Sequence, residues 1–292
     1  MFTGAITAIV TPFDEKGNLD LKSLKNLIDF QINEKIDGIV PCGTTGESPA
    51  LSKDEFGQVV KSVVDFTNGK VPVIAGSGSN STAHAVELTK MARDIGADAS
   101  LQVCPYYNKP TQQGLFLHFS EIAGKVDLPI VIYNIMGRTG INLETETLVR
   151  LAKEHSNIVG VKEASGNIAQ MMEVISSLPK NFDVLSGDDN LAFPLMCLGG
   201  KGVISVASNI IPNKMHSLSK MLSNGEIENA RRLHFELLPL FKSIFIETNP
   251  IPIKSALAMK GLISETYRLP LCQLKPENRE KLKSVLKSQK II

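Results

Sequence analysis

A lysine inside an apolar segment is the first residue of this sequence that could do chemistry. Lys162 stands in NIVGVKEASGN, residues 157–167, where the run of branched apolar residues would ordinarily continue with valine. A buried ammonium group is costly unless it is paired or loses its proton. A desolvated lysine has a lowered pKa, and its neutral amine can condense with a ketone to form a Schiff base. Taken alone, a reactive amine and a structural ion pair explain Lys162 equally well.

Schiff-base chemistry on a ketone needs helper groups, and the sequence offers three of them. The segment GTTGE, residues 43–47, supplies backbone N–H groups and the hydroxyls of Thr44 and Thr45, which suit a small carboxylate. Tyr133 is a phenolic acid–base candidate, and Arg138 can grip a carboxylate with two hydrogen bonds. Each also has a structural interpretation: a capped turn, a core tyrosine and a solvated arginine. Their occurrence at consecutive strand ends argues against coincidence.

Metal, thiol and dinucleotide chemistry have little support in the sequence. The five histidines form neither an H-E-x-x-H motif nor a close pair, so we expect no zinc site. The segment GSG at 76–78 falls short of a dinucleotide fingerprint, because Ser81 stands where a third glycine is needed. The cysteines are isolated, and we expect reduced, mostly buried thiols at Cys42, Cys104, Cys197 and Cys272.

Composition narrows the class of protein further. Of the 292 residues 43% are apolar, which is enough for a large core. The 31 Lys and Arg residues nearly balance 30 Asp and Glu, and no basic block or tryptophan suggests a nucleic-acid partner. The sequence has no signal-peptide pattern and no apolar run of the ~20 residues that a membrane span requires. We therefore expect a cytoplasmic protein.

Short β-branched runs alternate with amphipathic helical patterns along the chain. Helical periodicity is clear at 19–35 and at 82–96. Strands followed by helices imply parallel strands with crossovers, and eight such units in 220 residues predict a closed (β/α)8 TIM barrel. An open doubly wound sheet is the alternative, but the first strand leads into TPFDEKG and not into a glycine-rich phosphate turn. The predicted strands lie within 4–12, 38–43, 71–78, 99–105, 128–134, 158–165, 182–188 and 202–209.

The alternation of strand and helix patterns stops after residue 222. We therefore divide the chain into a catalytic barrel at 1–222 and a helical region at 223–292, packed on the barrel or on a neighbouring subunit. Three helical segments make up this region, GEIENARRLHFELLPLFKSIF, PIKSALAMKGL and PENREKLKSVLKSQK.

Strand geometry decides which way Lys162 points. In a TIM barrel the active site lies at the carboxyl ends of the strands. Side chains alternate along a strand, so Lys162 shares a face with Gly160 and Ala164, while Val161 and Glu163 share the other. The outer face meets helices and favours valine, which places Lys162 inside the barrel. Glu163 then lies on the wrong face to be its ion-pair partner.

At these residues the sequence resembles a known family. The segments GTTGE, PYYNKP, YNIMGRTG, GVKEASGN and NPIPIK closely resemble the 4-hydroxy-tetrahydrodipicolinate synthases, also called dihydrodipicolinate synthases. These enzymes belong to the superfamily of pyruvate-dependent class I aldolases and neuraminate lyases. The similarity covers essentially the whole chain. It implies condensation of pyruvate with L-aspartate 4-semialdehyde in the diaminopimelate route to L-lysine, without a metal or organic cofactor.

The resemblance also implies a role for individual residues. Lys162 would form the Schiff base with pyruvate, and Tyr133 would be the general acid–base. Thr44 and Tyr107, the latter from a neighbouring subunit, would complete a proton relay. The remaining positions would bind substrate: Thr45 and the backbone around Ile204 the pyruvate carboxylate, Arg138 the semialdehyde carboxylate, and Gly187 and Asn249 the surrounding shell.

Assembly and regulation follow from the same resemblance. Because Tyr107 would enter a partner's site, we expect a homo-oligomer, at least a dimer and in full a tetramer built from two dimers. Many members of the family bind L-lysine between subunits, and the corresponding positions here include Ser48, Asn80, His84 and Tyr106. Sensitive enzymes typically carry glutamate at position 84 and often histidine at position 53, where this chain has Lys53. We therefore expect weak or no feedback inhibition.

Two alternatives stay open at this stage. One is another aldolase of the superfamily, acting on neuraminate or a 2-keto-3-deoxy sugar acid; enzymes with neutral polyol substrates typically lack an arginine at position 138. The other is a non-catalytic barrel that binds a 2-oxo acid. One departure from the family concerns the loop before Arg138, where Met136 replaces a common proline. Proline would stiffen this loop, so we expect Arg138 to be held less firmly here.

Overall fold

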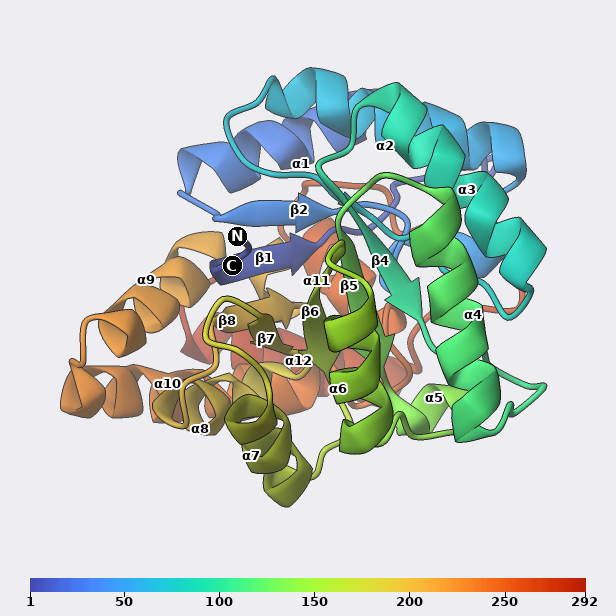
Figure 1. Ribbon diagram of the computed structural model, residues 1–292. Helices are drawn as coiled ribbons and strands as arrows, with labels where there is room; N and C mark the ends of the chain where they lie inside the picture. The colour runs from blue at the N-terminus through green and yellow to red at the C-terminus, as the bar shows by residue number, and fades with distance from the viewer.

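Eight parallel strands form one rolled sheet that helices surround (Figure 1). The computed structural model describes residues 1–292. Neighbouring strands follow the order β2-β1-β8-β7-β6-β5-β4-β3. The two ends of this order meet, because Ile39 forms a parallel bridge with Val73 and its N–H donates to the Pro72 carbonyl at 3.0 Å. The predicted (β/α)8 TIM barrel is confirmed. Its strands are β1 (Gly4–Ala8), β2 (Gly38–Val40), β3 (Ile74–Ala75), β4 (Ala99–Val103), β5 (Ile130–Asn134), β6 (Ile158–Glu163), β7 (Asp183–Ser186) and β8 (Gly202–Ser205).

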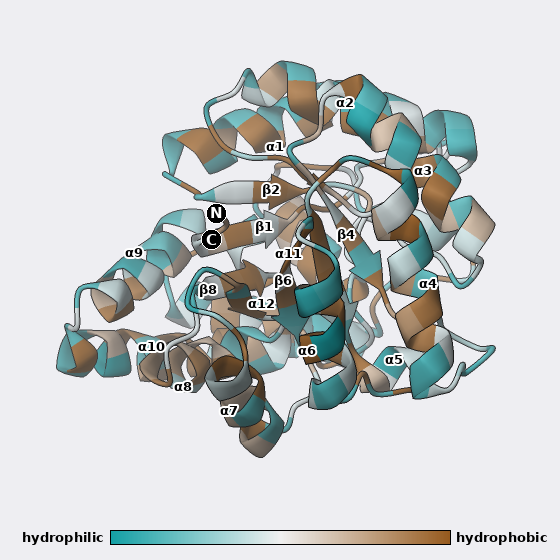
Figure 2. Ribbon diagram, in the orientation of Figure 1, coloured by the Kyte–Doolittle hydropathy of each residue, from teal (hydrophilic) through white to brown (hydrophobic).

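The helices around the sheet begin and end at residues that the sequence marks. Helix α1 starts after Asp20, whose side chain accepts a hydrogen bond from the Ser23 N–H, and α3 ends at Gly96 in the left-handed conformation. In Figure 2 the outer helices show alternating hydrophobic and hydrophilic bands, as amphipathic helices on a barrel do. The helices are α1 (Leu21–Asn33), α2 (Lys53–Thr67), α3 (Thr82–Ile95), α4 (Gln112–Lys125), α5 (Met136–Thr139), α6 (Thr145–Glu154), α7 (Ile168–Ser177), α8 (Ala192–Cys197) and α9 (Pro212–Ser223).

Apolar side chains gather in two layers, one inside the barrel and one between the strands and the helices. The outer cluster holds 63 buried residues and the inner one 12. Tyr133, Ala164 and Ile204 belong to the inner cluster. The parity of β5, β6 and β8 therefore turns these positions toward the barrel axis.

Three helices follow the barrel: α10 (Ile227–Ser243), α11 (Ile251–Met259) and α12 (Pro276–Ser288). Helix α10 contacts α8 and α9, and α12 contacts α10 and α11. Leu237, Leu257 and Leu282 from these helices belong to the same outer cluster as the barrel helices. The C-terminal helices thus continue the barrel's own core. No helix has the length and hydropathy to cross a bilayer.

The cysteines differ partly from expectation. All four are free thiols, and Cys42 and Cys104 are buried. Cys197 and Cys272 are exposed, so the prediction of mostly buried thiols is wrong for half of them. The reason is local, since Cys197 ends α8 at the surface and Cys272 lies in the loop before α12.

Candidate active site

A small cavity opens among the loops that follow the carboxyl ends of the strands. Seven of the residues singled out in the sequence line it: Thr44, Thr45, Tyr133, Arg138, Lys162, Gly187 and Asn249. They come from β5, β6, the loops after β2 and β7, the short helix α5 and the segment before α11. The fold therefore collects residues that lie up to about 200 positions apart in the sequence.

Lys162 lies between Tyr133 of β5 and Leu185 of β7 and is only 5% exposed. Its Nζ lies 4.1 Å from the centroid of the Tyr133 ring. None of the ion pairs in the molecule includes Lys162. Glu163 points elsewhere, because its carboxylate accepts hydrogen bonds from Asn134 Nδ2 at 3.2 Å and from the Ser165 N–H at 2.7 Å. Lys162 and Glu163 therefore form no ion pair, so the structural interpretation of Lys162 has no support from this contact.

Burial controls the protonation of this lysine. Removal from water lowers the pKa of Lys162 to about 8, the nearby Arg138 charge acts in the same direction, and Asp188 and Asp189 oppose it. A substantial fraction of the amine is then neutral near pH 8. Gly187 leaves room for the side chain, since a Cβ there would lie 3.1 Å from Lys162 Cε.

Tyr133 is equally buried, with the opposite effect on its proton. Burial raises the pKa of Tyr133 well above its ordinary value, and Asp188 adds to the rise, while Arg138 and a side-chain hydrogen bond with Thr44 oppose it. The phenol keeps its proton at neutral pH. Beside an amine that is partly free, it is placed to donate that proton and take it back.

Asn249 connects two groups that could hold carboxylates. Its side-chain Nδ2 donates to Thr45 Oγ1 at 2.9 Å, and its backbone carbonyl accepts a hydrogen bond from Arg138 Nη2 at 3.1 Å. The second contact holds the Arg138 guanidinium although Met136, at the start of α5, is exposed. The arrangement offers a hydroxyl and backbone cradle near Lys162 and a cation at the mouth of the cavity.

Sequence reasoning missed Asp188 and Val206, which also line the cavity. Asp188 directly follows Gly187 at the end of β7, so its place after a strand could have revealed it. Burial raises the pKa of Asp188, and the Lys162 charge lowers it. Ile204 itself is fully buried in the inner core and does not line the cavity. Val206, two residues further along the chain, lines the cavity instead.

The structure does not bring Tyr107 to the site of its own subunit. Its side chain is 91% exposed, and its backbone has the left-handed φ of 73°. The neighbouring Tyr106 is held by its carbonyl, which accepts from Asn80 Nδ2 at 3.2 Å. Asn108 in turn donates to the Asn80 carbonyl at 2.8 Å. The loop after β4 thus presents Tyr107 outward.

A larger cavity of about 410 Å³ adjoins the first one and shares Thr44 and Arg138 with it. Ser48, His84 and Tyr106 line it together with Lys53, whereas Asn80 is not among the lining residues. Three of the four residues proposed for an effector therefore share one hollow. Glu87 was missed, and it forms an ion pair with Lys53 and lies 3.3 Å from His84 Nδ1.

Comparisons with known proteins identify a family and several full-length relatives that this chain resembles. A model of the dihydrodipicolinate synthetase family matches residues 1–289. The chain is 52% identical over 292 residues to the 4-hydroxy-tetrahydrodipicolinate synthase of Syntrophus aciditrophicus (strain SB), covering 100% of both. The solved dihydrodipicolinate synthase of Aquifex aeolicus superposes with a TM-score of 0.98 at 47% identity, covering 99% of each chain. A structure described as the first monomeric dihydrodipicolinate synthase variant matches at a TM-score of 0.98 and 43% identity, covering 100% of this chain and 98% of that one.

Proposed function

This chain belongs to the dihydrodipicolinate synthetase family, and from that premise we propose that the cavity at Lys162 is the active site of a 4-hydroxy-tetrahydrodipicolinate synthase. Full-length relatives at about half identity carry this function. It is a lyase reaction of the class I aldolase type that condenses pyruvate with L-aspartate 4-semialdehyde on the route to diaminopimelate and L-lysine. The observation that carries the site assignment is a buried, unpaired lysine with a pKa near 8 beside a protonated phenol.

Lys162 starts the proposed reaction. Its neutral amine adds to the pyruvate ketone, and loss of water from the carbinolamine gives a protonated Schiff base. Tyr133 supplies the proton that the departing hydroxyl needs, and Thr44 relays protons to it. Loss of a proton from the methyl carbon gives the enamine, which is the carbon nucleophile. The lysine itself thus provides the electron sink.

The other residues orient the two substrates. Thr45 and the backbone of the GTTGE loop bind the pyruvate carboxylate, and Arg138 binds the carboxylate of the semialdehyde. The enamine attacks the aldehyde carbon, forming the new carbon–carbon bond. The amino group of the second substrate then attacks the Schiff-base carbon, closes the ring and releases Lys162.

Tyr107 extends the proposal to a second subunit. The side chain of Tyr107 is 91% exposed on the loop after β4, which leaves it free to enter the active site of a neighbouring subunit. We assign it to the proton relay of the partner's active site, in a homodimer that pairs into a tetramer.

The test of the site is covalent trapping. The protein is incubated with pyruvate and borohydride, digested, and searched by mass for the modified lysine. We expect the adduct on the peptide that contains Lys162, and Lys162→Arg should abolish it. Lys254, a second buried lysine, is the internal control and should stay unmodified. An adduct on any other lysine would refute the assignment.

The test of the substrate is a comparison of acceptors. L-aspartate 4-semialdehyde and sugar-derived aldehydes are offered to the pyruvate-loaded enzyme, and turnover is measured for each. We expect preference for the semialdehyde, because Arg138 presents a cation to its carboxylate. Preference for a polyol aldehyde would assign the chain to a sugar-acid aldolase.

A further inference from the structure

A buried ion pair lies behind the GTTGE loop, outside the cavity at Lys162. Lys254 Nζ lies 2.5 Å from Glu47 Oε1, and the two side chains are 0% and 1% exposed. The ammonium group also donates to the Thr11 carbonyl at 3.1 Å and lies 4.4 Å from the centroid of the Phe13 ring. Neither member of the pair lines the cavity, so neither touches a substrate there.

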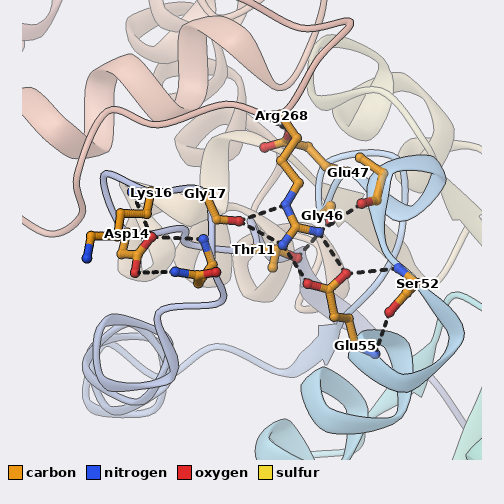
Figure 3. Close-up of polar contacts among 11 residues, drawn as sticks. Thr11, Asp14, Lys16, Gly17, Gly46, Glu47, Ser52, Glu55 and Arg268 are labelled. Carbon is orange, nitrogen blue, oxygen red and sulfur yellow. Dashed lines mark hydrogen bonds and ion pairs between the residues drawn. The ribbon is translucent and has the colours of Figure 1, made fainter.

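The second carboxylate oxygen of Glu47 extends the contact to the C-terminal region. Glu47 Oε2 accepts a hydrogen bond from the Arg268 N–H at 3.2 Å. The Arg268 guanidinium is itself fixed, because it binds Glu55 with two hydrogen bonds and donates to the carbonyls of Gly17 and Ala50. Figure 3 shows Arg268 between Glu47, Glu55 and Gly17. Both oxygens of Glu47 are thus held by residues that follow the barrel.

The loop conformation connects this anchor to the carboxylate cradle. Glu47 has φ 54°, a left-handed conformation that strains a residue other than glycine, and its N–H donates to the Thr44 carbonyl at 3.1 Å. Thr44 and Thr45 lie only three and two residues before it. Rotation of this loop would therefore move the hydroxyls of both threonines.

The same ion pair also fixes the other side of the cradle. Lys254 lies on α11, and Asn249 is separated from that helix only by its N-cap residue, Pro250. Asn249 donates to Thr45 Oγ1 and accepts a hydrogen bond from Arg138 Nη2. The pair therefore ties together the loop that carries Thr45 and the segment that holds both Thr45 and Arg138.

Stability alone does not explain this pair. Burial lowers the pKa of Lys254, and the Glu47 charge opposes that shift. Replacing both members of a buried ion pair by neutral groups of similar volume is often neutral or stabilising, whereas removing one member is strongly destabilising. A buried pair can instead fix one arrangement of the groups around it.

We propose that Glu47 and Lys254 are a positioning pair that holds the GTTGE loop and the Asn249 segment in the register needed to bind the pyruvate carboxylate. This inference rests on the proposed function, since it assumes that pyruvate binds at Lys162. It assigns to both residues an effect on pyruvate affinity that is separate from their effect on folding.

The experiment compares single and double substitutions. The variants are Glu47→Gln, Lys254→Met and the two together, and the control is Lys214→Met with Glu236→Gln, an ion pair between α9 and α10 whose members do not line the cavity. For each protein, thermal unfolding gives Tm, and borohydride trapping at increasing pyruvate gives the half-saturating concentration and the maximal adduct.

We expect the singles, and Lys254→Met above all, to lower Tm, because each leaves a buried charge without its partner. The double variant should recover a Tm close to that of the wild type and yet require about tenfold more pyruvate for half-saturation. Its maximal adduct should match the wild type, because Lys162 and Tyr133 are unchanged. The control should match the wild type in both measurements.

A double variant with wild-type half-saturation would overturn the inference and leave the proposed function standing. A double variant that fails to fold would also overturn it, because the pair would then be structural. Absence of any pyruvate adduct in the wild type would refute the proposed function itself, and the inference with it.

Discussion

At the scale of single residues, the proposed chemistry rests on two side chains whose pKa values are shifted in opposite directions by the same burial. Lys162 loses its proton more easily than a lysine in water, and Tyr133 holds its proton more tightly. Such a pair can provide a nucleophile and an acid together near neutral pH. Two solvated groups with ordinary pKa values would leave the amine almost fully protonated.

The pKa of Lys162 predicts how trapping depends on pH. Since the pKa is lowered to about 8, the neutral amine increases as pH rises through that value. The initial rate of adduct formation with pyruvate and cyanoborohydride should rise about tenfold per pH unit below 8 and level off above it. Asp188 raises the pKa of Lys162, so Asp188→Asn should shift the midpoint to lower pH. A midpoint near 10 in the wild type would show that the lysine is solvated.

Many residues of the candidate site can be predicted from the alternation of side chains along a strand and from their place at strand ends. Lys162 and Tyr133 interrupt apolar strands at inward positions, which is why the sequence identifies them. Asp188 carries only the weaker signal of its place after a strand, and Glu87 carries none, because acidic residues are common on helix surfaces. The backbone around Ile204 stays a prediction as a carboxylate contact, since Ile204 itself is buried and the cavity is lined by Val206, the residue after β8.

At the scale of elements, helices α2 and α3 decide the charge of the larger cavity. Lys53 begins α2, and His84 and Glu87 lie in the first turns of α3. Glu87 forms an ion pair with Lys53 and lies 3.3 Å from His84 Nδ1, and the hydrogen bond from Lys53 lowers the pKa of Glu87. The carboxylate of Glu87 is therefore already engaged by Lys53 and by the His84 ring.

This arrangement predicts weak feedback by L-lysine. An incoming ammonium group would meet Lys53 and His84 and would have to displace one of them from Glu87. The loss of one charged hydrogen bond corresponds to roughly ten- to a hundredfold weaker binding. Initial rates should therefore change little in a titration with L-lysine up to millimolar concentrations.

The control for this titration is His84→Glu, which restores a carboxylate and should increase inhibition. Strong inhibition of the wild type that disappears in Glu87→Gln would contradict the prediction. It would mean that Glu87 leaves Lys53 to bind the effector.

Element boundaries were less predictable than element order. The segment 71–78 was predicted as one strand, whereas β3 covers only Ile74–Ala75. The reason is a close backbone approach, because a Cβ at Gly76 would lie 2.4 Å from the Cys42 carbonyl oxygen. Glycine lets the chain leave the strand there and line the larger cavity, an effect that period-two patterning does not show.

At the scale of the whole molecule, one subunit has an incomplete set of the proposed relay groups. Lys162, Tyr133 and Thr44 lie together, while Tyr107 points outward. If the partner supplies Tyr107, Tyr107→Phe and Lys162→Met should complement each other. Each variant alone should have low turnover, and co-expressed mixed dimers should recover part of the wild-type rate, because one of their two sites has both groups.

The control mixes two preparations of Lys162→Met, which should stay inactive. Analytical ultracentrifugation should show that all variants keep the same assembly. A wild-type monomer with full activity would rule out the shared site and would resemble the monomeric variant found among the structural relatives.

The closed barrel follows from the alternation of strands and helices, but the boundary after residue 222 stays a prediction. The outer core runs without a break from the barrel helices into α10, α11 and α12. Packing of this kind depends on which distant surfaces meet, and local periodicity carries no information about it. The buried contact of Lys254 with Glu47 cannot be predicted from the sequence for the same reason.

That contact joins positions 207 residues apart, which matters for recombination between related genes. A chimera with residues 1–222 from this chain and the remainder from a relative takes Glu47 from one parent and the residue opposite it from the other. Sequence identity near the crossover says nothing about whether these two positions match. The parents most suitable for shuffling are therefore those that share a lysine at position 254 and an arginine at position 268, whatever their similarity elsewhere.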